Sequence, residues 1–411
     1  SSTVFFEEFL PVSEHIAPRY YVGAYTEQEI HGNKRWLMET IRSAPGLAHN
    51  VGGDFTFDIM RAEPPAKDAV IALEEGAEAL VPVFGTADGQ VLTAQTETVD
   101  DCIWLNPATP NYFRLNATTR LSSAEDFVVG TPIRIGHSPA RRKLVLNILV
   151  DALPWQVLRA SFADHMPNTA RFFAYGTIFD QHFSVLEYTY PSLASIETGM
   201  YLHHSQVFNE VFGQEIDPSY VTISECMKEL GYFCVNVMGE GDGIYNGVTR
   251  GFDRIIIDAT YLRGYEAVER TIRHIQAFDE CDQFLWMHFA DPHVYSARTQ
   301  APPTSIQTHL PLGLRLEGSG DQETSVNLPS RPIYIAANRE NIRSADRALG
   351  VLFDYLEQHF SDDEYIVHLY SDHGVPVYEK EPYLTSEKQA GAALMMRGGD
   401  IPARGIVQEL T

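Results

Sequence analysis

Apolar and polar positions follow different patterns in the two parts of the chain, and the change falls near residue 140. After this point, continuous apolar runs alternate with segments of helical period, which is typical of a mostly parallel sheet covered by helices on both faces. Before it, short runs are separated by turn signals such as Asp88-Gly89. We therefore predict an α/β domain at residues 141–411, with a mostly parallel sheet flanked by helices, and a smaller β-rich domain at residues 1–140.

Four continuous apolar runs in the second part predict buried strands. They are Leu144–Val150, Tyr232–Met238, Phe284–Ala290 and Tyr365–Tyr370. Helical periodicity predicts helices at Ser224–Leu230 and Asn338–Phe360. Polar or acidic residues follow each strand, and ligands of open α/β sheets bind outside the carboxyl ends of the strands. One edge of the sheet is therefore expected to carry Asp151, Asp291, His293, Asp372 and His373.

The first part of the chain gives weaker signals. An amphipathic helix is predicted at Gln28–Arg42, and short runs predict strands at Asp54–Met60, Ala79–Gly85 and Cys102–Leu105. Three aromatic residues here could bind a sugar, but such side chains are more often buried, so we expect ordinary core residues. They are Trp104, Tyr112 and Phe113. The pattern assigns no role to this domain.

The segment Val294–Arg331 is rich in Pro, Gly and polar residues. It is longer than an ordinary connection within a compact domain. Long segments of this kind are either disordered insertions or lids over a site, and the sequence favours neither.

The stretch Thr189–Gly199 predicts a helix with a hydroxyl group at its start. Thr189 suits the N-cap, Pro191 suits the first turn, and Gly199 suits the end of the helix. The N-terminus of a helix offers unpaired N–H groups, which would stabilise an alkoxide or a phosphate-like anion beside Thr189. Taken alone, the stretch is more typical of a capped structural helix.

Charge and composition limit the partners and the location. The chain has 411 residues, of which 44% are hydrophobic, and a formal net charge of −25. Nucleic acid and anionic membrane surfaces would repel such a protein, whereas an acidic excess suits cation binding. No apolar run is long enough for a membrane span, and residues 1–6 do not resemble a secretory signal. A cytoplasmic location is expected, or an extracytoplasmic one if a signal has been removed.

The cysteines predict neither a zinc ribbon nor a disulfide framework, because their spacing forms no paired motif. They are Cys102, Cys226, Cys234 and Cys281.

The polar residues at the strand ends predict a metal site with a nucleophile beside it. Asp151, Asp372, His373 and Thr189 together supply two carboxylates, an imidazole and a hydroxyl. This set favours Zn or Mn, although Ca or Mg would also accept its oxygen ligands. A bound cation would lower the pKa of the Thr189 hydroxyl and would neutralise charge on the substrate, while His293 could donate to the substrate or leaving group.

Eight short motifs occur along the second part of the chain. They are Leu146–Asp151 with Trp155, Met166-Pro167-Asn168 leading to Gly176 and Phe179, Thr189–Gly199, Leu230-Gly231-Tyr232, Gly251-Phe252-Asp253, Asp291-Pro292-His293, Ser371-Asp372-His373-Gly374 and Met395-Met396-Arg397-Gly398. In this order they make residues 144–411 resemble the sulfatase branch of the alkaline phosphatase superfamily.

The resemblance implies roles for the matching residues. It implies Asp151, Thr189, Asp372 and His373 as metal ligands, Thr189 as nucleophile, and His293 near the transferred group. One divalent metal ion is preferred, and a second is possible because Asp291 and His293 could contribute ligands. Further candidates for a second metal or for substrate contact are His203, His204, Lys380 and Lys388, although surface or supporting roles are more common for such residues.

The departures from the family pattern are also informative. Sulfatases convert a Cys or Ser to formylglycine with the help of a following Arg, but this chain has Thr189 and Leu193 at those positions. Ala152 replaces the second acidic residue of an Asp-Asp pair, and residues 239–243 lack the usual Lys and His. The site therefore resembles the Thr-using relatives, which include phosphodiesterases, phosphoethanolamine transferases and glycerol-phosphate transferases. The resemblance also leads us to expect that the usual C-terminal end of the family is absent from residues 141–411.

These observations lead to one hypothesis and two alternatives. We expect a metal-dependent hydrolase or transferase of phosphate esters that uses Thr189 through a covalent phospho-enzyme, acting on a small-molecule or glycan ester. The alternatives are a sulfatase that works without formylglycine and a catalytically degenerate protein used for binding or assembly. An oligomer is possible, and the sequence identifies neither the substrate nor the metal.

Overall fold

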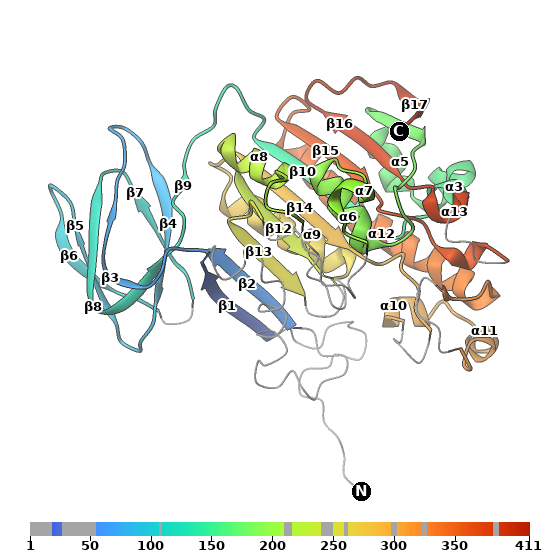
Figure 1. The fold of residues 1–411 in the computed structure, drawn as a ribbon, viewed down its shortest axis with the longest axis horizontal. Helices are drawn as coiled ribbons and strands as arrows, with labels where there is room; N and C mark the ends of the chain where they lie inside the picture. The colour runs from blue at the N-terminus through green and yellow to red at the C-terminus, as the bar shows by residue number, and fades with distance from the viewer. Residues whose placement is uncertain are drawn as a thin grey trace, which may run out of the picture.

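The computed structural model contains two β-sheets, and helices pack on the larger one (Figure 1). It describes residues 19–26, 55–106, 109–208, 216–239, 250–258, 262–296, 302–321, 327–380 and 386–411. The helix predicted at Gln28–Arg42 lies outside the described residues.

The larger sheet has ten strands in the order β1-β2-β13-β12-β14-β10-β15-β16-β11-β17. Their bounds are β1 Arg19–Tyr25, β2 Phe55–Arg61, β10 Leu144–Val150, β11 Thr177–Gln181, β12 Phe233–Met238, β13 Arg254–Asp258, β14 Gln283–Phe289, β15 Tyr365–Tyr370, β16 Leu394–Gly398 and β17 Gly405–Leu410. The four neighbours β12, β14, β10 and β15 are parallel. They match the four predicted buried strands to within one residue, so the prediction of a mostly parallel sheet is confirmed.

Helices cover both faces of this sheet. Their bounds are α3 Trp155–Leu158, α4 Phe162–His165, α5 Pro167–Phe173, α6 Thr189–Thr198, α7 Leu202–Ser205, α8 Ile223–Glu229, α9 Gly264–Ala277, α10 Thr304–Gln307, α11 Leu312–Glu317, α12 Pro332–His359 and α13 Glu387–Ala390. The predicted helix at Asn338–Phe360 is longer than expected, because Pro332 begins α12 at a position where its missing N–H costs nothing. The helix predicted at Ser224–Leu230 is α8, which begins with a Thr222–Glu225 capping box.

Alternate residues of the central strands pack on opposite sides of the sheet. On one side, Leu146 and Ile148 of β10 join the core formed with α5, α9 and α12, in which the rings of Phe172 and Phe353 stack 4.1 Å apart. On the other side, Val145 and Leu149 of β10 join a second cluster that includes α6 and α8. Burial on both faces explains why these strands read as continuous apolar runs.

The described part of the Val294–Arg331 segment contains α10 and α11. Ile306 and Leu310 are buried there and pack with Ile333 and Ala337 of α12. The interpretation of a disordered insertion is therefore wrong for these described residues, which form part of the packed structure.

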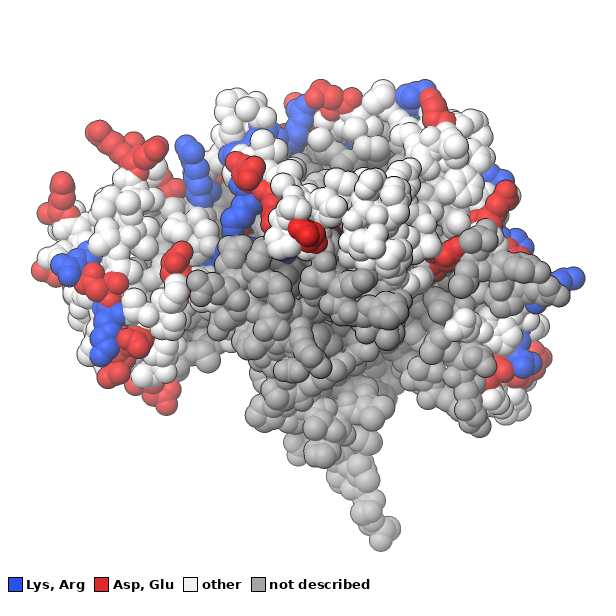
Figure 2. Space-filling view, in the orientation of Figure 1, with Lys and Arg blue, Asp and Glu red and all other residues white. Residues whose placement is uncertain are grey.

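The smaller sheet has the strand order β6-β5-β8-β4-β7, with β3 paired to β8 and β9 paired to β4. Its strands are β3 Ala66–Ile71, β4 Ala79–Gly85, β5 Val91–Gln95, β6 Asp100–Trp104, β7 Asn111–Leu115, β8 Thr119–Val129 and β9 Ile133–Arg134. Every pairing is antiparallel. The β-rich character predicted for the first part is confirmed, and its acidic side chains are visible on the outside of this sheet (Figure 2).

The predicted boundary at residue 140 does not separate the two sheets. Strands β1 and β2 precede it, yet β2 pairs antiparallel with β13 and β1 pairs parallel with β2 in the larger sheet. A short apolar run such as Asp54–Met60 predicts a strand but not its partner, because the pairing is decided by contacts distant in sequence.

The three aromatic residues of the smaller sheet have different environments. The expectation of ordinary core is wrong for Trp104, which is 70% exposed on β6. Tyr112 joins the two parts of the chain, since its ring packs edge-on against Phe278 at 5.6 Å and its hydroxyl lies 3.1 Å from the sulfur of Met60. Phe113 packs against the core of the smaller sheet.

Among the described residues, no helix has both the length and the apolar character that a membrane span requires.

Replacing Phe353 on α12 tests the core between this helix and the sheet. Phe353→Ala should lower the free energy of unfolding by about 3–5 kcal/mol, because it removes a buried ring and leaves a cavity beside Phe172. Val351→Ala is the matched control, since Val351 is 53% exposed on the same helix and its truncation should cost less than about 0.5 kcal/mol. Urea unfolding measures both, and equal losses would contradict the assigned packing of α12.

Candidate active site

Three adjacent parallel strands bring the predicted polar residues together. Strand β10 lies between β14 and β15, with Val150 paired to Phe289 and Leu149 paired to Tyr370. Because these strands run in the same direction and are in register, the residues that follow them meet at one edge of the sheet. This register places Asp151 beside the segments that contain His293 and His373.

Helix α6 brings Thr189 to this edge. It begins at Thr189 and ends before Gly199, whose φ of 68° provides the left-handed cap. Thr189 is not the N-cap as expected, because Tyr188 holds that position and no side chain caps the helix. The Thr189 hydroxyl instead donates to Asp151 Oδ2 at 3.2 Å and lies 3.2 Å from His373 Nε2. The hydroxyl thus faces the strand ends.

Asp151, His293 and His373 form a group that could hold a metal ion. One ligand atom from each lies within 4.8 Å of the others, and all three residues are buried. His293 Nε2 is 3.7 Å from Asp151 Oδ1, and His373 Nε2 is 3.6 Å from the same oxygen. The sequence predicted Asp151 and His373 as ligands and placed His293 beside the transferred group or at a second metal, whereas the geometry groups His293 with the other two residues.

The ring orientation of His373 suits metal binding. Its Nδ1 lies 2.6 Å from the carbonyl oxygen of Gly374, and a carbonyl can only accept, so Nδ1 carries the proton. In the neutral imidazole, the lone pair is then on Nε2, which faces Thr189 and Asp151. Histidine ligands commonly donate their second N–H to a backbone carbonyl in this way.

Asp372 borders the same group. Its Oδ1 accepts hydrogen bonds from the N–H groups of Ala152 at 3.2 Å and His373 at 3.0 Å. Its Oδ2 is buried without a hydrogen bond and lies 3.4 Å from His373 Nε2. A buried carboxylate oxygen in this situation fits a cation, since leaving it unpaired is costly. Ala152 adopts a φ of 58°, an uncommon value for a residue with a Cβ, and this conformation accompanies the contact with Asp372.

The electrostatic environment also suits a cation. Burial lowers the pKa of His373, but the carboxylates of Asp372 and Asp151 outweigh it and raise the pKa above its usual value. Burial, together with the nearby imidazoles of His373 and His288, holds the pKa of His293 well below its usual range. Two buried carboxylates therefore attract positive charge to this place, and a neutral His293 keeps its ligand capacity.

Two buried residues beside the site were not predicted. His288 Nε2 lies 3.1 Å from Asp151 Oδ2, although His288 stands within an apolar run that the sequence indicated only as a strand. A single imidazole in such a run was the available signal. Glu187, two residues before Thr189, is also buried, and this burial raises its pKa while nearby His373 opposes the rise.

The remaining sequence candidates lie outside the ligand group. Asp291 Oδ2 accepts the N–H of Gly264 at the start of α9, at 2.7 Å. His203 and His204 are exposed, with their rings 4.0 Å apart. Lys380 is exposed, and Lys388 donates to the carbonyl oxygen of Tyr378 at 3.0 Å. Within the described part of the chain, one group of potential metal ligands is found, and none of these five residues belongs to it.

Comparison with known proteins identifies relatives of this chain. The protein family described as Sulfatase matches residues 143–409, and no curated protein matches. A solved structure from Bacteroides thetaiotaomicron, described with metabolism of multiple glycosaminoglycans, is 15% identical with a TM-score of 0.51, covering 66% of this chain and 70% of that one.

Two further solved structures have a similar coverage. The predicted sulfatase yidJ from Bacteroides fragilis is 17% identical with a TM-score of 0.50, over 65% of this chain and 70% of that one. The phosphonate monoester hydrolase of Agrobacterium radiobacter is 17% identical with a TM-score of 0.47, over 66% and 71%. At these identities, the structural similarity concerns the fold alone.

Helix α6 also contains a buried acidic residue, Glu197. The Ser224 hydroxyl donates to its Oε2 at 3.2 Å, while its Oε1 has no hydrogen bond. Burial raises the pKa of Glu197 to about 8, and the hydrogen bond from Ser224 only partly offsets this rise. The carboxyl group is therefore expected to be protonated at neutral pH in the folded protein.

Glu197 should make the stability of the protein fall as pH rises. Between the unfolded pKa of about 4.3 and the folded value, the folded state binds the extra proton, so the free energy of unfolding decreases across this range, by up to about 1.4 kcal/mol per pH unit. Urea unfolding at pH 5, 6.5 and 8 measures the decline. Glu197→Gln, which keeps the shape without titrating, should flatten it, and an unchanged slope in this variant would contradict the assignment.

Proposed function

This chain belongs to the sulfatase family of hydrolases, within the alkaline phosphatase superfamily, and we propose that it cleaves phosphate esters with Thr189 as the nucleophile. The observation that carries the proposal is the position of the Thr189 hydroxyl. It lies 3.2 Å from both Asp151 Oδ2 and His373 Nε2, at the carboxyl edge of the parallel sheet. A hydroxyl beside a carboxylate and an imidazole has the surroundings of an activated nucleophile.

The residues that would hold a divalent cation are Asp151, His373 and Asp372, with His293 beside them. Zn or Mn suits this mixture of carboxylate and imidazole better than Ca or Mg. When bound, such a cation would lower the pKa of the Thr189 hydroxyl and neutralise charge on a nonbridging oxygen of the substrate. The remaining steps are carried by the side chains of the chain itself.

Attack by Thr189 would proceed in line with the leaving group. The hydroxyl already donates to Asp151 Oδ2, which is the acceptor for its proton. The new bond from Oγ1 to phosphorus forms as the ester P–O bond breaks, and the departing alkoxide takes up a proton from water. Water or an acceptor alcohol would then take the phosphoryl group from Thr189 and regenerate the free hydroxyl. With water the protein would act as a hydrolase, and with an alcohol it would act as a transferase.

The residues around Thr189 favour phosphate over sulfate. A threonine cannot be converted to the formylglycine aldehyde, and Leu193, which is buried on α6, stands where sulfatases have an arginine. A threonine hydroxyl that acts directly suits phosphoryl transfer through a phospho-threonine. Sulfate-ester cleavage is the second candidate, because the matched family is named for that activity.

Substrate preference and the role of Thr189 can be tested together. We expect the metal-loaded protein to hydrolyse an aryl phosphate monoester or diester faster than the corresponding aryl sulfate. Thr189→Ala should lower kcat by about a thousandfold or more, because it removes the attacking atom, while Thr189→Ser should retain part of the activity. A faster reaction with the sulfate, or full activity in folded Thr189→Ala, would contradict the proposal.

The metal ligands can be tested without an activity assay. Zn or Mn should bind with a stoichiometry near one and raise the Tm. At a free metal concentration of 100 Kd, binding should add about 2.7 kcal/mol to the free energy of unfolding. Asp372→Asn should bind less metal and show little increase in Tm. His204→Ala is the matched control, since His204 is exposed outside the ligand group, and it should behave like the wild type.

His293 has two candidate roles that metal content separates. If His293→Ala keeps the metal but loses kcat, His293 contacts the transferred group. If the variant loses the metal as well, His293 is a ligand, as its distance of 3.7 Å from Asp151 Oδ1 allows.

A further inference from the structure

A cavity of about 380 Å³ lies against the face of the central sheet that α5, α9 and α12 do not cover. Its floor consists of residues that are paired across four adjacent strands. Asn147 of β10 pairs with both Trp286 and His368, and His368 pairs with Met396 of β16. Because paired residues point to the same face, the strand register builds one continuous floor.

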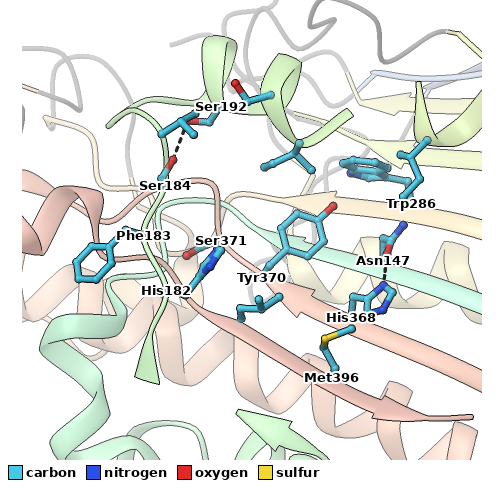
Figure 3. Close-up of a pocket in the computed structure, with 15 residues that line it drawn as sticks. Asn147, His182, Phe183, Ser184, Ser192, Trp286, His368, Tyr370, Ser371 and Met396 are labelled. Carbon is cyan, nitrogen blue, oxygen red and sulfur yellow. Dashed lines mark hydrogen bonds between the residues drawn. The ribbon is translucent and has the colours of Figure 1, made fainter. Parts of the chain in front are cut away.

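The walls of the cavity come from α6 and from the segment that follows β11. Ser195 and Ile196 of α6 line one side, and Phe183 lines another. Figure 3 shows the Tyr370 ring between Ser371 and Trp286, and it shows the hydrogen bond between Ser184 and Ser192 at the edge of the cavity. Its volume is within the range of small-molecule sites.

The lining carries no formal charge near neutral pH. It contains no Asp, Glu, Lys or Arg. Of its two histidines, burial lowers the pKa of His182 to about 4 and lowers that of His368 below its usual value. The surface around α6 and α7 is also largely free of charged side chains (Figure 2). A charged ligand would lose its hydration here without gaining a counter-ion, so the cavity selects for neutral molecules.

Two buried hydroxyl groups in the lining lack hydrogen bonds in the described structure. They are Tyr370 Oη and Ser195 Oγ, and each residue is 8% exposed. Buried polar groups normally have a hydrogen-bond partner, because leaving a buried hydrogen bond unmade is costly.

We propose that this cavity is a binding site for a neutral, mainly apolar molecule that has one hydroxyl or carbonyl group. The apolar part would pack against Trp286, Leu394 and Met396, and the polar group would bind Tyr370 Oη and Ser195 Oγ. The lining contains neither Thr189 nor any residue of the group of potential metal ligands. Binding in this cavity therefore does not depend on the proposed reaction.

A pair of ligands with the same chain length tests the proposal. The neutral fluorescent probe N-phenyl-1-naphthylamine should bind the full chain with one site, and 1-decanol should displace it. Decanoate should bind with an affinity about tenfold or more below that of 1-decanol, because the cavity offers no positive charge to its carboxylate. Absence of saturable binding, or equal displacement by the two ligands, would overturn the proposal.

Variants identify the place of binding. Tyr370→Phe preserves the shape of the cavity and should lower the affinity for 1-decanol about three- to tenfold, with little change in the affinity for the probe. Leu394→Trp should fill the cavity and abolish binding of both molecules. Val351→Trp is the matched control, because it adds the same ring at an exposed position of α12. Wild-type affinities in folded Tyr370→Phe and Leu394→Trp would show that the ligands bind elsewhere.

Discussion

The two buried carboxylates of Asp151 and Asp372 impose the strongest constraint on this structure. Both lie at the carboxyl ends of central parallel strands, and both are fully buried. Such charges need nearby donors or a cation, because the protein interior solvates them poorly. The His373 imidazole, the Thr189 hydroxyl and the N–H of Ala152 approach them. The start of α6 and the turns after β10 and β15 are thus arranged around negative charge.

The two faces of the large sheet meet different requirements. One face is closed by an apolar core with α5, α9 and α12, which holds the strands rigidly in register. The other carries Asn147 and His368 among apolar residues, and α6 covers it while leaving a cavity. Helix α6 therefore contributes to the proposed active site with Thr189 and to the cavity with Ser195.

Side-chain contacts link the smaller sheet to the larger part, and two strands from early in the chain belong to the larger sheet. Arg114 of β7 pairs with Glu280, and Tyr112 packs against Phe278 near the end of α9. Strands β1 and β2 extend the larger sheet beyond β13. Residues early in the chain thus complete the sheet that carries the proposed active site.

The sequence by itself determined the central strands and the edge at which Asp151, Asp372 and His373 meet, because buried parallel strands give long apolar runs and their polar ends face one direction. The end of α6 at Gly199 also followed from a local signal, whereas the N-cap position expected for Thr189 belongs to Tyr188. Only the tertiary structure decided that His288 and His293 face Asp151, that β1 and β2 join the larger sheet, and that His203 and Lys388 lie outside the ligand group. These contacts depend on pairing and packing between distant segments, which local periodicity does not encode.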